Sequence, residues 1–541
     1  MVTVLLQSSL EKVFLDSGAF APAYERASAL GGERFSFQLV LGRTERGTAP
    51  CKVWVESPFP GEISLFLVGQ VPCQLPAYPN CGGGYLTTRP GLFPDPLFPL
   101  EEGEVTVSSF SPTAVWVEAA VPQGCPPGEY PLRCLAECQG ERAWADFTLQ
   151  VVGADLPEQK LRYTQWVHGD CLAQWYQTPV YGPAYWELLG RYLALAAQEG
   201  MNVVLTPALT PPLDTEVGKE RLPTQLLDIE KEGETYRFGF SRLERFLAVA
   251  RQAGMRYFEV GHLFTQWGAK AAPAVYALEN GARRRIFGWD TPAAAGAYGA
   301  FLGQMLPALT RFFREQGLEG KVFFHLSDEP GEEHLENYRR AKELVKPYLG
   351  DFPLYDALSD PAYYDSGLVD HPVAATDRIG PFLERKVPGL WAYYCCAQGV
   401  DVSNRFLAMP SCRNRILGWQ LYKFQVEGFL HWGYNFWNTQ LSRQAIDPYQ
   451  VTDGGRAFPG GDPFSVYPGK EGPVPSLRQK VFCQGLQDLR ALELLEARQG
   501  RQAAEECLPG FGGLTFSRCP REAASLLTGR EEVNRRLAQG R

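Results

Sequence analysis

The chain has 541 residues, of which 45% are hydrophobic and 21% are charged, and its formal net charge is -9. A domain holds roughly 150 residues, so this length predicts at least two domains, and the composition is typical of folded globular proteins and not of disordered ones. The negative charge, without any cluster of Lys and Arg, argues against a nucleic-acid partner, because binding to phosphates depends on cationic side chains.

The amino-terminal residues MVTVLLQSSLEKVFLD lack the basic start, the apolar segment and the small-residue cleavage site of a secretory signal. No run of about 18 apolar residues is found, so no membrane span is expected. The 13 cysteines are an odd number, and the adjacent Cys395 and Cys396 suit neither a usual disulfide nor the common zinc sites. These features predict a cytoplasmic protein with reduced thiols.

The first part of the chain reads as short strands that are rich in Val, Phe and Trp and separated by Gly and Pro. These predicted strands cover residues 35–41, 51–56, 63–69, 114–122, 130–138 and 144–152. The pattern predicts an N-terminal β-sandwich over residues 1–155. Residues 78–100 are rich in Pro and Gly, and we expect an irregular loop there that covers the sandwich edge or, alternatively, reaches over a neighbouring active site.

Strands and helical patterns alternate after the linker at residues 153–160, which is typical of a mainly parallel sheet. The predicted strands are residues 163–170, 201–207, 256–262, 321–327, 352–358, 371–377, 390–396 and 428–437. Helical patterns cover residues 183–200, 336–345 and 477–496. Eight such units predict a multidomain α and β protein in which a (β/α)8 TIM-type barrel over residues 160–500 follows the sandwich. A doubly wound sheet is the alternative, although no GxGxxG follows its first strand. A helical tail, 501–541, is expected to pack on the barrel.

Polar side chains gather where these strands end, and the carboxyl ends of barrel strands are where active sites lie. His168 and Asp170 lie at the end of the first strand, His262 at the end of the third, and His325 at the end of the fourth. The three histidines, together with Asp170, offer ligands for zinc from separate strands, although no local HxxxH or HxH pair supports such a site.

The stretch FFHLSDEP, residues 323–330, places Asp328 and Glu329 side by side at the end of an apolar strand. Neighbouring carboxylates repel each other and burial disfavours ionisation, so one of them should keep its proton at a pH where the other is ionised. Neighbours in one chain cannot easily flank a sugar as acid and nucleophile. They suit a substrate whose own 2-acetamido group attacks the anomeric carbon, with Asp328 orienting the acetamide and Glu329 acting as acid/base. The alternative is a pair that caps the next helix and contacts solvent.

Aromatic faces stack on sugar rings, and the chain contains 12 Trp, 24 Tyr and 32 Phe. The candidates for a sugar platform at the strand ends are Trp267, Tyr393, Tyr394, Trp432 and Trp437. Side chains alternate along a strand, so one of Tyr393 and Tyr394 should face the helices, and we expect Tyr394 to contact the sugar. The other predicted substrate-binding residues are His168, Asp170, His262, Gln266, His325 and Asn435.

Eight segments carry a resemblance to a known family. They are PGLFPDPL (90–97), WVHGD (166–170), LTPPLDT (209–215), GHLFTQWGA (261–269), HLSDEP (325–330), YDALSD (355–360), LWAYYCC (390–396) and NRILGWQLY (414–422). Together they resemble glycoside hydrolase family 123. The resemblance implies a β-N-acetylgalactosaminidase with a β-sandwich and a (β/α)8 barrel, which acts on a glycan by substrate assistance and uses no metal or organic cofactor. It implies Asp328 as acetamide stabiliser and Glu329 as acid/base.

Two alternatives to this function remain at the level of sequence. One is a noncatalytic carbohydrate-binding protein on a barrel scaffold, against which the intact Asp328 and Glu329 argue. The other is a metal-dependent hydrolase that uses His168, His262 and His325. The oligomeric state is not indicated by any pattern.

Overall fold

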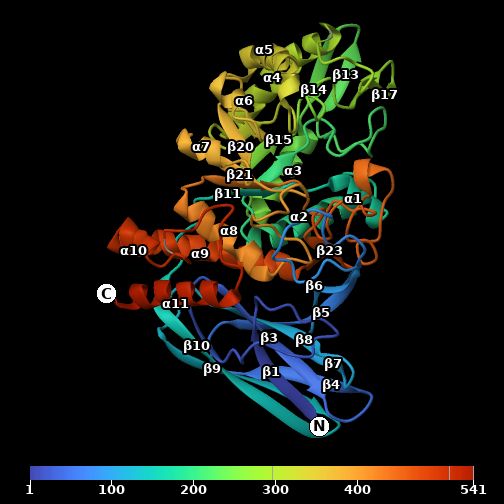
Figure 1. Cartoon of the computed structure of the whole chain (residues 1–541). Coiled ribbons are helices and arrows are strands. Elements are labelled where there is room, and N and C mark those ends of the chain that lie inside the picture. Colours follow the sequence, from blue (N-terminus) through green and yellow to red (C-terminus); the bar gives the residue numbers. More distant parts are fainter. Residues whose placement is uncertain (295, 511, 540–541) are drawn as a thin grey trace.

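Two sheets of five strands form the amino-terminal region of the computed structural model, which describes residues 1–294, 296–510 and 512–539 (Figure 1). The first sheet has the order β1 (Val2–Ser8), β3 (Arg34–Arg43), β8 (Thr113–Ala120), β5 (Glu62–Cys73) and β6 (Gly91–Pro99). The second has the order β2 (Arg26–Gly31), β10 (Glu141–Asp155), β9 (Gly128–Cys138), β4 (Thr48–Glu56) and β7 (Glu104–Ser108). Leu39 and Val117 of the first sheet share a hydrophobic core with Leu132 and Phe147 of the second.

Strand β6 corrects the prediction of an irregular loop over residues 78–100. Residues 91–99 pair antiparallel with β5. The prolines of β6 are tolerated because it is the edge strand of its sheet and makes only one ladder of hydrogen bonds. The other strands of the amino-terminal region that the sequence did not indicate are β1, β2 and β7.

Eight parallel strands lie at the centre of the second region. One sheet has the order β11 (Arg162–Gln165), β22 (Gly428–His431), β21 (Trp391–Tyr393), β20 (His371–Ala375) and β19 (Tyr355–Leu358). The other has the order β12 (Val203–Thr206), β15 (Tyr257–Val260) and β18 (Val322–Phe324). The sheets meet on two sides: Phe324 of β18 forms a parallel bridge with Leu354, and Asn202 N donates to Tyr163 O of β11 at 3.1 Å. Each strand overlaps one of the eight predicted ranges.

Helices alternate with these strands, as expected for a parallel sheet. They are α1 (Gly169–Trp175), α2 (Pro183–Gln198), α3 (Ser241–Ala253), α4 (Gly296–Glu315), α5 (Leu335–Leu349), α6 (Ala362–Asp365), α7 (Gly380–Glu384), α8 (Ser411–Lys423) and α9 (Leu477–Gln499). In α2, Pro183 opens the helix, and Trp186, Leu189 and Leu193 are buried at the spacing of one helical face. Within the described residues, no helix combines the length and the apolar character needed to cross a membrane.

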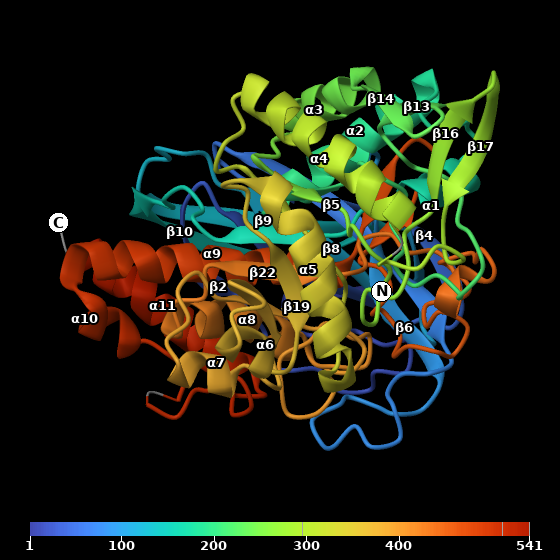
Figure 2. The same cartoon turned by 90° about the horizontal axis from the view of Figure 1, so that it is seen from above.

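Two hairpins form a separate four-stranded sheet at the edge of the second region (Figure 2). They are β13 (Asp228–Glu232) with β14 (Thr235–Gly239) and β16 (Val275–Glu279) with β17 (Ala282–Phe287). The remaining short elements are the 3-10 helices η1 (Glu332–His334) and η2 (Gln440–Ser442), the strands β23 (Val466–Pro468) and β24 (Pro473–Pro475), and the helix α10 (Arg501–Glu505).

The last helix, α11 (Ala523–Gln539), contacts both regions of the protein and not the second region alone. It lies against β2 and β10 of the first region and against α8 and α9 of the second (Figure 1). Arg530 of α11 pairs with Glu33 on one side and with Asp488 of α9 on the other. The tail therefore fixes the sandwich strands to the helices behind the parallel strands.

The loop before β6 reaches the second region as well. The Tyr85 hydroxyl donates to Gly399 O at 2.8 Å, and Leu86 N donates to Ala408 O at 2.8 Å. Gly399 and Ala408 belong to the segment that follows β21 at the carboxyl ends of the parallel strands. The loop therefore contacts the segment after β21, although none of its residues lines the cavity at the strand ends.

Candidate active site

A cavity of ≈ 190 Å³ lies at the carboxyl ends of the parallel strands. Its aromatic wall consists of Trp166, Trp267, Tyr393, Trp432 and Phe458. Its carboxyl groups are those of Asp214, Asp328 and Glu329. Aromatic rings beside a few carboxyl groups are a surface on which a sugar can stack and also be protonated.

Asp328 and Glu329 lie in a bend that begins four residues after the end of β18. Glu329 has a φ of 41°, a left-handed backbone conformation that residues other than glycine rarely adopt. Trp267 N donates to Asp328 O at 2.9 Å, and the Ser327 hydroxyl donates to Thr265 O at 2.9 Å. These bonds fix the bend to the loop after β15, and both adjacent carboxyl groups then line the same cavity.

Glu329 is held by the hydroxyl of Tyr393, which donates to Glu329 Oε1 at 2.7 Å. Burial raises the pKa of Glu329, the hydrogen bond from Tyr393 opposes this rise, and the charge of Asp377 adds to it. A buried carboxyl group whose pKa is raised is better able to carry a proton near neutral pH, as a general acid must.

Asp328 is more strongly affected than its neighbour. Burial raises its pKa well above the usual range, the charge of Glu329 raises it further, and the positive charge of His325 opposes both effects. Two carboxyl groups that interact in this way do not both ionise readily. Over the pH range in which only one of the two has lost its proton, the cavity contains one carboxylic acid and one carboxylate.

His325, three residues before Asp328, lies between two buried carboxylates. Its Nε2 is 2.9 Å from Glu259 Oε2, and its Nδ1 is 3.5 Å from Asp356 Oδ1. Burial lowers the pKa of His325, but the hydrogen bonds with Asp356 and Glu259 outweigh burial and raise the pKa to about 9. The positive charge of His325 lowers the pKa of Asp328, and His325 does not line the cavity, where a sugar contact was expected.

His262 stacks on His325, with ring centroids 4.7 Å apart, and burial lowers the pKa of His262 well below its usual value. His262, His325 and Asp356 are the described residues whose ligand atoms come close enough together for a metal ion, within 4.8 Å of one another. His168 does not belong to this group. The three-histidine set of the metal-hydrolase alternative is therefore not brought together, and His262 is not part of the cavity wall either.

His168, Asp170 and Asn435 form a buried network beside the cavity. Arg221 donates to both carboxylate oxygens of Asp170, at 2.7 and 2.8 Å, and its Nη2 is 3.1 Å from His168 Nδ1. The other ring nitrogen of His168 is 2.9 Å from Trp432 O. Asn435 bonds the backbone of His168, accepting from its N at 2.8 Å and donating to its O at 3.0 Å. None of these three residues, each predicted to contact the sugar, lines the cavity. His168 instead contacts the backbone of Trp432, whose side chain does line the cavity.

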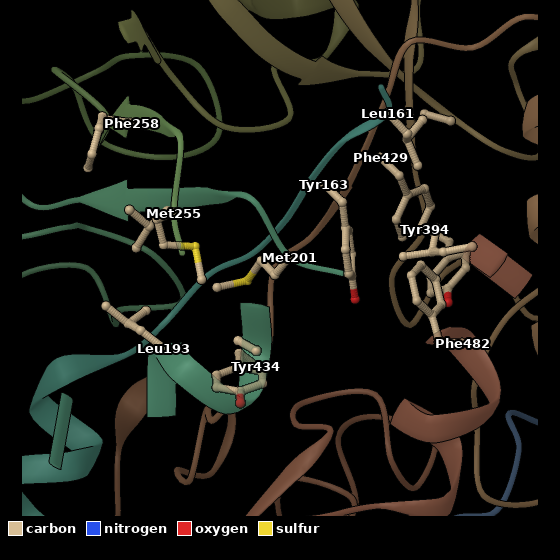
Figure 3. Close-up of a cluster of buried hydrophobic side chains, with 14 of the residues drawn as sticks. Leu161, Tyr163, Leu193, Met201, Met255, Phe258, Tyr394, Phe429, Tyr434 and Phe482 are labelled. Atoms are coloured by element: carbon tan, nitrogen blue, oxygen red, sulfur yellow. The ribbon is translucent and has the colours of Figure 1, made fainter. Parts of the chain in front are cut away.

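Tyr393 occupies the position in the wall that the sequence analysis assigns to Tyr394. Tyr394 is completely buried, with its ring 4.8 Å from that of Phe429, in the hydrophobic cluster of Figure 3. Trp437 is also a core residue, 2% exposed, and its indole donates to Val466 O at 3.3 Å. The aromatic character of these positions was visible in the sequence, but the side on which each ring lies was not.

Three other predicted residues do line the cavity: Gln266, Trp267 and Trp432. Trp267 is 40% exposed, which places its ring at the mouth, whereas the Trp432 indole is fixed by a 3.0 Å hydrogen bond to Asp462 Oδ2. The Gln266 side-chain oxygen accepts from Asp214 N at 2.6 Å, so Gln266 orients the loop of Asp214.

Several wall residues were not predicted as site residues: Trp166, Leu213, Asp214, Ala357, Cys395, Cys396, Leu430, Gln440 and Phe458. Asp214 is the notable one, because burial raises its pKa to about 6. The sequence feature that could have indicated Asp214 is its place in LTPPLDT, one of the segments that carry the family resemblance. Gln440 and Phe458 come from the long connection after β22, where no pattern marks them.

Comparison with known proteins shows the family of the chain. The family model of the glycoside hydrolase 123 catalytic domain matches residues 166–495, which is more than half of the chain. No curated protein sequence matches. Among solved structures, a family 123 glycoside hydrolase from Clostridium perfringens, described in a study of glycolipid glycan hydrolysis, covers 100% of this chain and 98% of its own, with a TM-score of 0.75 and 14% identity.

An endo-β-1,4-mannanase from Thermotoga petrophila is more distant, with a TM-score of 0.35 and 12% identity over 61% of this chain and 77% of its own. The match to the catalytic-domain model covers seven of the eight parallel strands, β11 being the exception, and includes both Asp328 and Glu329. The chain therefore belongs to glycoside hydrolase family 123.

Proposed function

We propose that this glycosidase removes a β-linked N-acetylhexosamine, most specifically N-acetylgalactosamine, from a glycan, with retention of configuration and with the substrate's acetamide as nucleophile. The observation that carries the proposal is the presence of Asp328 and Glu329, adjacent in the chain, in one aromatic-walled cavity. A protein nucleophile and an acid would have to flank the sugar about 5 to 5.5 Å apart, which neighbours in one bend cannot easily do.

In the first step of the proposed reaction, the acetamide oxygen attacks the anomeric carbon while the bond to the leaving oxygen breaks. Glu329 gives its proton to that oxygen, and Asp328 accepts a hydrogen bond from the acetamide N–H and stabilises the positive oxazolinium. In the second step, water attacks the anomeric carbon, Glu329 takes a proton from the water, and the oxazoline ring opens.

The proton must lie on Glu329 and the negative charge on Asp328 when the sugar is bound. In the free cavity the stronger rise in pKa belongs to Asp328. An acetamide N–H that donates to Asp328 favours its ionised form, and the positive charge of His325 favours the same form. Binding of the correct substrate would therefore move the shared proton to Glu329.

The proposed scaffold for this chemistry is a (β/α)8 barrel. Its support is the set of eight parallel strands, the bridge between Phe324 and Leu354, and the hydrogen bond between Asn202 and Tyr163, which connect the two sheets on both sides. Residues of the cavity wall that follow β11, β18, β21 and β22 would then converge at the carboxyl-terminal mouth of the barrel.

We also propose the glycan of a glycolipid as the natural substrate class, because the similar enzyme from Clostridium perfringens was studied for glycolipid glycan hydrolysis.

The test of substrate assistance compares aryl β-N-acetylgalactosaminide, aryl β-N-acetylglucosaminide and aryl β-galactoside under the same conditions. We expect hydrolysis of the N-acetylgalactosaminide and none of the galactoside, which lacks the nucleophile. Rapid turnover of the galactoside would exclude substrate assistance.

A further inference from the structure

Two adjacent thiols, Cys395 and Cys396, line the same cavity as the carboxyl pair. Both are half-buried, and the side chains of the two cysteines contact each other. The sulfur of Cys395 lies 4.0 Å from Glu329 Oε1 and 3.2 Å from the side-chain oxygen of Gln398. The proposed reaction assigns no role to either thiol.

The backbone of this thiol pair is firmly held. Cys395 N donates to the side-chain oxygen of Gln398 at 2.9 Å, and the Asn404 amide donates to Cys395 O at 2.9 Å. On the other side, the Tyr78 hydroxyl of the amino-terminal loop contacts the thiol of Cys396, and burial together with this contact raises the pKa of Tyr78. A ligand that needs two neighbouring sulfur atoms would meet them with little loss of conformational freedom.

We propose that Cys395 and Cys396 form a two-thiol binding site for trivalent arsenic compounds, and that an occupied site closes the cavity to the sugar. An organic arsenic(III) oxide forms two As–S bonds, its As–O bonds break, and the oxygen leaves as water with the two thiol protons. Arsenic remains trivalent, so the step needs no oxidant or reductant. Sulfur is the preferred donor for soft ligands of this kind.

The other neighbouring pairs among the thirteen cysteines are less suited to bind arsenic, because at least one member of each is buried. Cys51 and Cys138 face each other across β4 and β9, but they are 3% and 5% exposed. Cys519 is half-buried, but the neighbouring Cys412 is 2% exposed. The pair in the cavity wall is therefore the one in which both cysteines are half-buried.

An arsenic atom bridging these sulfurs would lie beside Glu329, because the Cys395 sulfur is 4.0 Å from its carboxylate. Its organic substituent would fill space in a cavity of ≈ 190 Å³. The adduct should consequently exclude substrate and should be removed by a small dithiol, which forms the same two bonds, but not by a monothiol at equal thiol concentration.

The test uses phenylarsine oxide and intact-mass measurement of the full chain, so its outcome does not depend on the identity of the sugar. We expect one phenylarsenic adduct per chain, with the loss of one water. The adduct should be absent in Cys396→Ser and kept in the controls Cys519→Ser and Cys51→Ser. The same treatment should abolish hydrolysis of the aryl N-acetylgalactosaminide by the wild-type enzyme, and a dithiol should restore it.

A second measurement avoids substitutions altogether. Wild-type protein treated with the arsenical is labelled with a maleimide after denaturation at a pH that preserves the adduct, and the labelled peptides are mapped. The proposal predicts protection of Cys395 and Cys396 together. Protection of another pair, an adduct that survives in Cys396→Ser, or a wild-type chain without an adduct would overturn it. An adduct without loss of turnover would disprove the closure of the cavity.

Discussion

The hydroxyl of Tyr393 donates a 2.7 Å hydrogen bond to Glu329 Oε1, and this bond joins the end of β21 to the bend after β18. It stabilises the ionised form of Glu329, so it lowers a pKa that burial raises. The bond therefore lowers the pH at which the proposed acid loses its proton.

Replacing Tyr393 by Phe should raise the pKa of Glu329. Because the acid must be protonated, the high-pH limb of the profile of kcat/KM should move to higher pH. A hydrogen bond to a charged group contributes about 1.5–3 kcal/mol, so we expect kcat to fall roughly ten- to a hundredfold. Steady-state kinetics from pH 5 to 9 measure both effects. Tyr394→Phe, which removes a hydroxyl from the core, is the control. If the high-pH limb of kcat/KM did not move in Tyr393→Phe, the role of Glu329 as the acid would be contradicted.

Glu329→Gln should affect substrates according to their leaving groups. General acid catalysis contributes roughly 10²–10⁴-fold, and a good leaving group needs less of it. We therefore expect a large loss of kcat/KM on a natural glycan and a smaller loss on a nitrophenyl glycoside. Glu332→Gln, an exposed position three residues away, is the matched control. Equal losses on both substrates would show that Glu329 is not the acid.

Asp328→Asn should remove activity on both kinds of substrate. An amide cannot offer the negative charge that stabilises the oxazolinium, and this need does not depend on the leaving group. Single-turnover kinetics with the nitrophenyl glycoside distinguish slow chemistry from slow product release. If Asp328→Asn showed the leaving-group dependence expected of Glu329→Gln, the two roles would have to be exchanged.

His325 should remain protonated at a pH where ordinary histidines are neutral. Its pKa in the folded protein is about 9, above the unfolded value of 6.5. The stabilisation that it provides is therefore complete below pH 6.5 and is lost as the pH rises through about 9, and its size is on the order of 3 kcal/mol. Imidazole NMR, assigned with His325→Asn, gives the titration directly, and denaturant unfolding gives the stability. His262 is the internal comparison, since it should stay neutral over this range. A His325 titration near pH 6.5 would contradict the ion-pair network.

The positions of the parallel strands and of the carboxyl pair could be predicted because both depend on local patterns. Apolar runs mark buried strands, and Asp328 and Glu329 follow one of them. The choice between Tyr393 and Tyr394 could not be made, because it depends on the phase of a strand that is only three residues long, Trp391–Tyr393. β6 was not predicted as a strand, because its prolines are compatible with a strand only at a sheet edge.

The predicted roles of His168 and Asp170 show a different limit of sequence reasoning. Both residues follow β11 where cavity residues belong, but Arg221, about fifty positions away, pairs with both. No local pattern connects Arg221 to them. Likewise, Asp214 enters the wall through a loop that bonds Gln266 and Leu441, and such contacts between loops depend on the folded chain.

The direct test of the central claim is the binding of a thiazoline derived from N-acetylgalactosamine, a stable mimic of the bicyclic oxazoline. The account predicts competitive inhibition much tighter than that by N-acetylgalactosamine itself, with affinity lost in Asp328→Asn, because a mimic of the reactive intermediate gains the contacts made to it. The contradicting result is a wild-type enzyme that the thiazoline does not inhibit. Such an enzyme would instead form a covalent glycosyl adduct with a fluorinated glycoside, which intact-mass measurement would detect.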